Sequence, residues 1–116
     1  MPIIITAQGN EPLPSGRYRV KLVGIEQLET DYGDVIKWVF IVLGEPHTVV
    51  GYTPVSGSIG SKCMRWVSAL LNRAIQPNEQ VDLETLLGRT AIAGVFYRKR
   101  DGEAYNEVAE LIPDYE

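Results

Sequence analysis

Residues 16–43 read GRYRVKLVGIEQLETDYGDVIKWVFIVL, and this stretch decides the fold. Over residues 17–22 cations alternate with apolar side chains, which is the pattern of a half-buried β-strand. Residues 35–43 are dense in β-branched and aromatic side chains, which predicts a second strand. Its expected core face consists of Ile36, Trp38, Phe40 and Val42. Residues 29–34 supply turn chemistry, with Gly33 able to take a positive φ, so we expect the two strands to pair antiparallel.

Composition describes a single small domain. At 116 residues and 45% hydrophobic content, the chain can close one core without disulfides or a structural metal. Cys63 is the only cysteine and His47 the only histidine, so neither an internal disulfide nor a Cys/His metal cluster is expected. No stretch has the pattern of a signal peptide or a membrane span, and we therefore expect a cytoplasmic, reduced setting.

The net charge of −4 hides an asymmetry along the chain. All 11 bases lie at or before Arg100, together with nine of the 15 acids, which leaves that part at +2. The remaining acids are Asp101, Glu103, Glu107, Glu110, Asp114 and Glu116. A balance this close to neutral is compatible with a nucleic-acid partner but does not by itself favour one.

Two more strand-like segments belong to the first half of the chain. Residues 2–7 are apolar enough for a short edge strand, and the turn-forming residues 8–16 that follow exclude a helix. We therefore treat residues 1–15 as an N-terminal extension of the domain. Residues 47–53 form a third predicted strand, which ends where Pro54 removes a ladder donor.

The hydrophobic period then changes from two to 3.6, which predicts a helix. The apolar positions are Ile59, Cys63, Trp66, Val67, Leu70, Leu71 and Ala74. Ser58 or Ser61 can cap its start, and Pro77 stops it by disfavouring the α region in the preceding residue. A second, single-turn helix is indicated by Asp82 as N-cap and Gly88 as the residue after the C-cap.

A β-hairpin is expected at the end of the chain. Strand patterns cover residues 90–98 and 105–112, and the Asp-Gly pair at 101–102 is typical of the turn between them. The pattern leaves the inward face of the first of these strands open. Two sets compete for it: Ala91, Ala93 and Val95, or Ile92, Gly94 and Phe96.

Three strands, a helix and a hairpin form the element order of the OB-fold, a five-stranded Greek-key barrel. The competing arrangement is an α+β sandwich with the helix across an open sheet. Gly24, Gly51 and Gly94 interrupt predicted strands, either as bulges that curl a barrel or as sites of close packing. Trp38 and Phe40 are expected to fill the interior, and Trp66 to face the core or a subunit interface.

Several segments together resemble the small phage-type single-stranded-DNA-binding proteins of the OB-fold class. They are LPSGRYRVKL (13–22), GDVIKWVFIV (33–42), LLGR (86–89), AYNEV (104–108) and Ile112-Pro113. The resemblance runs over most of the chain from Leu13 onward and depends on the order of these segments. It implies a DNA-binding protein of replication or recombination, with single-stranded nucleic acid, DNA preferred, as its partner.

Single-strand binding needs cations that follow phosphates and rings on which bases stack. The predicted hairpin offers both, in Tyr97, Arg98, Arg100 and Tyr105, although a basic hairpin tip can also serve solubility alone. Elsewhere the candidate contacts are Arg17, Arg19, Lys37 and Tyr52. The first-strand arginines either extend the basic track or pair with Glu107 or Glu110 across the sheet.

The leading hypothesis is thus a non-catalytic, sequence-tolerant binder of single-stranded DNA. The alternative is a viral or mobile-element protein-interaction module on a similar barrel, for which the acidic last strand is the contact surface. No Gly-rich phosphate loop, nucleophile motif or paired catalytic carboxylates occur in a defined context, so we expect neither an enzyme nor a cofactor. Whether the chain forms a homo-oligomer is open at this stage.

Overall fold

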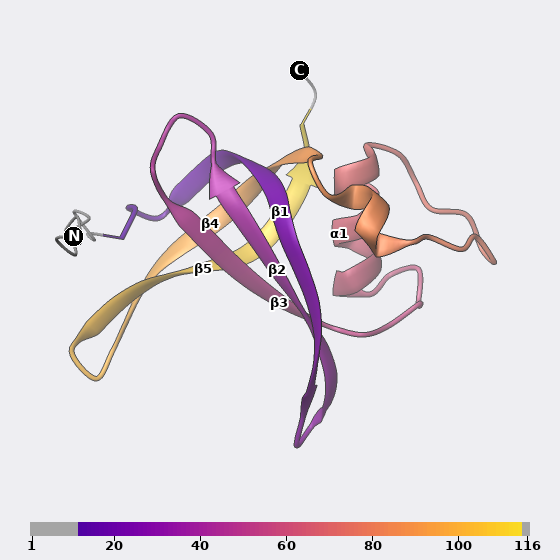
Figure 1. Ribbon diagram of the computed structural model, residues 1–116, viewed down its shortest axis with the longest axis horizontal. Coiled ribbons are helices and arrows are strands. Elements are labelled where there is room, and N and C mark those ends of the chain that lie inside the picture. Colours follow the sequence, from indigo (N-terminus) through magenta and orange to yellow (C-terminus); the bar gives the residue numbers. More distant parts are fainter. Residues whose placement is uncertain (1–11, 115–116) are drawn as a thin grey trace, which may run out of the picture.

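The computed structural model describes residues 12–114, and these form a mainly β structure with one α-helix (Figure 1). The strands are β1 (Gly16–Thr30), β2 (Gly33–Val42), β3 (Thr48–Pro54), β4 (Thr90–Arg100) and β5 (Glu103–Pro113). Between β3 and β4 come helix α1 (Lys62–Leu71) and the 3₁₀ turn η1 (Leu83–Leu86). The predicted mainly β class is confirmed; the edge strand expected at residues 2–7 lies outside the described residues.

The five strands close into a ring in the order β1-β2-β3-β5-β4. All neighbours pair antiparallel except β3 and β5, which meet in parallel at Val50 and Glu107. The long β1 serves two neighbours, because its first residues pair with β4 and its later ones with β2. The open-sheet sandwich is therefore wrong. Both the β1–β2 and the β4–β5 hairpins project beyond the barrel: in the view of Figure 1 the first points downward and the second to the lower left, on the side away from α1.

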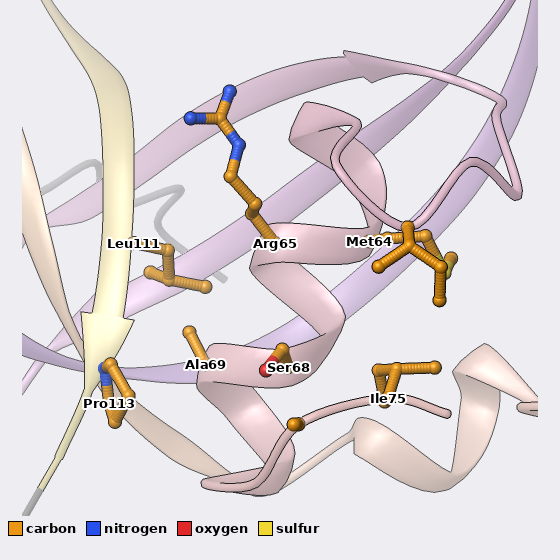
Figure 2. A pocket seen from close by; sticks show the side chains of 9 residues that line it. Met64, Arg65, Ser68, Ala69, Ile75, Leu111 and Pro113 are labelled. Carbon is orange, nitrogen blue, oxygen red and sulfur yellow. The ribbon is translucent and has the colours of Figure 1, made fainter. Parts of the chain in front are cut away.

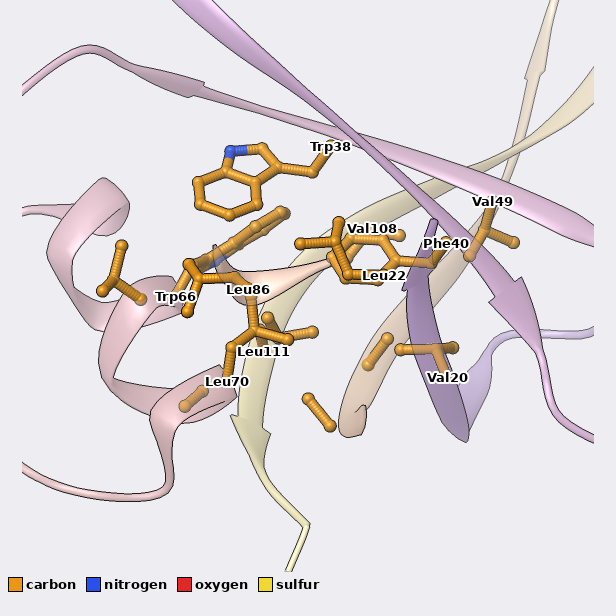
Figure 3. Close-up of a cluster of buried hydrophobic side chains, with 14 of the residues drawn as sticks. Val20, Leu22, Trp38, Phe40, Val49, Trp66, Leu70, Leu86, Val108 and Leu111 are labelled. Atoms are coloured by element: carbon orange, nitrogen blue, oxygen red, sulfur yellow. The ribbon is translucent and has the colours of Figure 1, made fainter. Parts of the chain in front are cut away.

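Aromatic side chains fill the interior, as the alternation in β2 predicts. Trp38 and Phe40 are fully buried, and the ring of Trp66 from α1 lies 5.7 Å from the first and 6.1 Å from the second (Figure 3). The buried indole N–H of Trp38 donates to the hydroxyl of Thr53 at 3.0 Å, so this polar group has a hydrogen-bond partner in the core. All three aromatic residues thus belong to the core.

The inward face of β4 is the one formed by Ala91, Ala93 and Val95, which are essentially inaccessible. Small side chains suit this position because the two tryptophans already occupy much of the interior. Phe96, from the competing set, is 44% exposed on the outer face. Gly94 is buried as well, but it faces outward and is covered by the side chain of Glu110.

The three strand glycines divide between bulges and close packing. The β1–β2 register shifts beside Gly24, and the β4–β5 register shifts beside Gly94, so both accompany β-bulges. Gly51 instead lies against Trp66, since a Cβ there would meet the ring at 2.3 Å. The bulge in β5 also lets Val108 and Leu111, three residues apart, both face inward.

Helix α1 is shorter than the apolar period predicts. Ser61 is its N-cap, accepting a hydrogen bond from the Met64 N–H at 3.2 Å, but the helix ends at Leu71. Asn72 takes the left-handed conformation that closes a helix, so the chain turns well before Pro77. The predicted caps of the short turn hold, with Asp82 accepting from Glu84 and Gly88 at a positive φ of 89°.

Strand and turn limits differ slightly from expectation. The third strand runs from Thr48 to Pro54, one residue later than predicted at both ends. In the last hairpin both strands are longer, and Asp101 and Gly102 alone form the loop. Both take positive φ values, 51° and 81°, as a type I′ turn requires. No helix within the described 12–114 has the length and apolarity to cross a membrane.

Candidate nucleic-acid interface

Strand register places Lys37 and Tyr52 side by side on the outer face of the barrel. The two residues are direct cross-strand partners on β2 and β3, and their neighbours Trp38 and Gly51 point inward. Tyr52 is 48% exposed, so its side chain is accessible to a ligand. The ring and the cation thus form one short cluster.

The same outer face continues over β5 to β4. Val50, two residues before Tyr52, pairs with Glu107, and Tyr105, two residues before Glu107, pairs with Arg98. Residues two apart on a strand share a face, so Tyr52 and Tyr105 lie on one continuous surface. They are four strand positions apart, about 13 Å along the strand direction at roughly 3.3 Å per residue. We call this surface, comprising Lys37, Val50, Tyr52, Phe96, Arg98, Tyr105 and Glu107, the outer β2–β3–β5–β4 face.

Tyr97 is not part of that face. It pairs with Asn106 and therefore points to the other side of the hairpin from Arg98 and Tyr105. On that side the Asn106 amide holds Leu13 through two 2.9 Å hydrogen bonds, and the Tyr97 N–H donates to the Ser15 hydroxyl at 2.8 Å. The predicted cluster of two tyrosines and two arginines is thus divided between two faces.

Arg98 already forms an ion pair with the carboxylate of Glu107. Its Nε donates to Glu107 Oε2 at 2.9 Å, and its guanidinium lies 5.1 Å from the centroid of the Phe96 ring. Both members of the ion pair are about half exposed, so a phosphate can still reach the arginine, but it must compete with Glu107. Such exposed pairs contribute about 1 kcal/mol or less.

The first-strand arginines are also paired with acids, one in β5 and one directly after it. Arg17 meets Glu110 at 3.4 Å, and this is possible because Glu110 lies across Gly94, where a Cβ would be 2.4 Å from its Cγ. Arg19 donates through Nε to Asp114 at 2.6 Å, and Asp114 is almost fully buried. Of the two interpretations of these arginines, the structure therefore favours ion pairing over a basic track.

The acidic end of the chain and the arginines of β1 and β4 therefore compensate one another in space. Strand β5 lies next to β4, and its carboxylates reach β4 and β1. Within residues 12–114, Lys37, Lys99 and Arg100 take part in no ion pair. Lys99 is one of the three cations in the predicted hairpin, but it was not a candidate contact, and it faces the same side as Tyr97. The exposed ring of Phe96 was not predicted as part of the site.

The tip of the β1–β2 hairpin carries the opposite charge. Asp31, Tyr32 and Asp34 are all exposed, and the Tyr32 ring is fully so. The turn is held locally, since Thr30 Oγ1 donates to the Gly33 carbonyl at 2.6 Å and accepts from the Tyr32 N–H at 3.2 Å. This tip offers a ring to a ligand but repels phosphate.

Comparison with protein families and with curated proteins finds no match for this chain.

Proposed function

We propose that the chain is an OB-fold protein that binds single-stranded DNA without catalysis and with little sequence preference. The ring order β1-β2-β3-β5-β4, with a parallel contact between β3 and β5, supports an OB-type Greek-key barrel. In such barrels the face of the second and third strands, with the β1–β2 and β4–β5 loops, takes the ligand.

The observation that carries the proposal is the placement of exposed rings and cations on that same face. Tyr52 and Lys37 occupy β3 and β2, and Tyr105 extends the surface toward the tip of the β4–β5 hairpin, where Arg100 faces the same side as Tyr105. Bases stack on tyrosine rings irrespective of sequence, while Lys37 and Arg100 meet phosphates. Arg98 can contact a phosphate only when its ion pair with Glu107 is broken.

The division of the hairpin into two faces gives a matched test. Tyr105 and Tyr97 are 44% and 46% exposed but lie on opposite sides. Replacing Tyr105 by Ala should weaken binding of a labelled oligo(dT), measured by fluorescence anisotropy, about tenfold, because base stacking is worth ~1–3 kcal/mol. Tyr97→Ala should leave the affinity unchanged. Equal losses in both variants, or none in either, would contradict this assignment of the face.

A second candidate function is a protein-interaction module on the same barrel. It is favoured by the ion pairs, because Arg17, Arg19 and Arg98 are all engaged by carboxylates. In this case the outer β2–β3–β5–β4 face contacts a protein and gives no salt-dependent binding of oligonucleotides.

A further inference from the structure

An apolar groove runs along α1, on a part of the barrel that the outer β2–β3–β5–β4 face does not include. Two adjoining hollows of about 230 and 460 Å³ share Ile59, Met64 and Ile75 in their lining. Figure 2 shows the first of them, with Leu111 and Pro113 of β5 on one side of the helix and Met64 and Ile75 on the other.

The floor of the groove is aliphatic. Ile75, Ala69 and Leu111 are buried beneath it, while Ile59 is 51% exposed at its rim. No ring of Phe, Tyr or Trp lines either hollow. Because base binding relies on aromatic platforms, this surface suits aliphatic or aromatic side chains of a partner better than nucleotides.

The loop after α1 gives the groove a fixed wall. Arg73 binds Glu79 through two hydrogen bonds, of 3.0 and 2.6 Å, and Glu79 also accepts from the Gln76 N–H at 3.1 Å. The guanidinium lowers the pKa of Glu79 to about 2, so this contact persists at neutral pH. At the other end, Asn72 donates its amide to the Asp114 carbonyl. The groove therefore exists before a partner arrives.

Two cations border the groove and keep their charge available. Arg65 lines the 230 Å³ hollow and, with Lys62 and Leu111, a further one of about 210 Å³ beside it. Neither cation is in an ion pair within the described part of the chain, although Lys62 lies 5.2 Å from the Trp66 ring. The acids nearby are engaged, Glu79 by Arg73 and Glu110 by Arg17. The border is thus positive in a chain of net charge −4.

We propose that this groove is a docking site for an acidic peptide segment with large apolar side chains. The apolar residues enter the hollows beside Met64 and Ile59, and the carboxylates meet Lys62 and Arg65. Charge complementarity selects the acidic partner, since the aliphatic floor alone would accept any apolar peptide. The site is separate from the one proposed for DNA, so either can fail without the other.

The test uses the full chain and three fluorescein-labelled hexapeptides. The first has three acidic residues followed by Ile, Leu and Phe; the second replaces the acids with lysines; the third replaces the apolar residues with serines. Fluorescence anisotropy should show binding of the first and an affinity at least about tenfold weaker for the other two. Equal binding of the acidic and basic peptides, or no binding of the first, would overturn the proposal.

Variants locate the contact. Arg65→Glu and Ile59→Ser change exposed side chains and should each lower the affinity for the acidic peptide about tenfold. Arg89→Glu, an exposed cation outside the groove, should not change it. If Arg65→Glu fails to fold, Lys62→Glu tests the same charge. Loss of oligo(dT) binding in Arg65→Glu with no effect on the peptide would assign the groove to nucleic acid and contradict the peptide proposal.

Discussion

At the residue scale, a glycine explains how one large side chain from the helix reaches the centre of the barrel. Gly51 faces inward from β3, and the Trp66 ring lies where its Cβ would be, with further contact to Val108. Trp66 can therefore approach Trp38 and Phe40 across a strand backbone.

We expect Gly51→Ala to destabilise the protein by about 1–3 kcal/mol, because the added methyl overpacks a dense core. Urea unfolding followed by tryptophan fluorescence measures the free energy of unfolding. Gly57→Ala is the matched control, since its Cβ would meet no atom within 4 Å. Equal stability of the two variants would show that the approach of Trp66 to Gly51 is less tight than described.

A single carboxylate pairs with Arg98, a cation of the proposed DNA face. Glu107 holds Arg98 at 2.9 Å on the outer β2–β3–β5–β4 face. Glu107→Gln should therefore tighten oligo(dT) binding about tenfold or less and make its salt dependence steeper by about 0.7, the contribution of one more phosphate contact. Anisotropy titrations at several salt concentrations measure both quantities. An unchanged slope would mean that Arg98 does not meet the DNA.

At the element scale, the position of β5 determines what the arginines do. Its carboxylates face Arg98 in the same hairpin and Arg17 of β1, which lies far from β5 in sequence. Sequence periodicity does not reveal this, because it depends on which strands become neighbours and on the bulge beside Gly94 that sets their register.

Local signals, in contrast, predicted much of the fold. The alternation in β2, the capping residues Ser61 and Asp82 and the Asp-Gly turn act over a few residues, and each holds in the structure. The division between Tyr97 and Arg98 was also readable, because adjacent strand residues face opposite sides. The predicted site instead placed Tyr97 and Arg98 together because they are adjacent in the sequence.

The loop that follows α1 should respond to acid. Because the folded pKa of Glu79 is lowered from 4.5 to about 2, its pairing with Arg73 stabilises the protein above about pH 4.5. That stability is lost as the pH falls through the folded value. We expect Glu79→Gln to be less stable than the wild type at neutral pH.

Urea unfolding of both proteins at several pH values tests this. The difference should shrink between about pH 4.5 and 2, where the wild-type carboxylate becomes protonated. Because the pair is solvent-exposed, added salt should also reduce the difference. A difference that stays constant across this range would assign the effect of the variant to something other than the ion pair.

At the scale of the whole molecule, a closed five-stranded ring gives an acidic chain one face with exposed rings and a few cations without carboxylate partners. The arginines that the sequence suggested are mostly compensated. Lys99 shares the side of Tyr97, so the proposed phosphate contacts on this face reduce to Lys37 and Arg100. Binding should be moderate and sustained largely by stacking on Tyr52 and Tyr105.

The most direct test of this account is the salt dependence of oligo(dT) binding by the wild-type chain, with a duplex of the same length for comparison. Two phosphate contacts, at about −0.7 each for single strands, predict a slope of about −1.4 in the plot of log affinity against log salt concentration. We expect that slope together with weaker binding of the duplex. An absence of binding at low salt, or an equal affinity for the duplex, would contradict single-strand binding by this face.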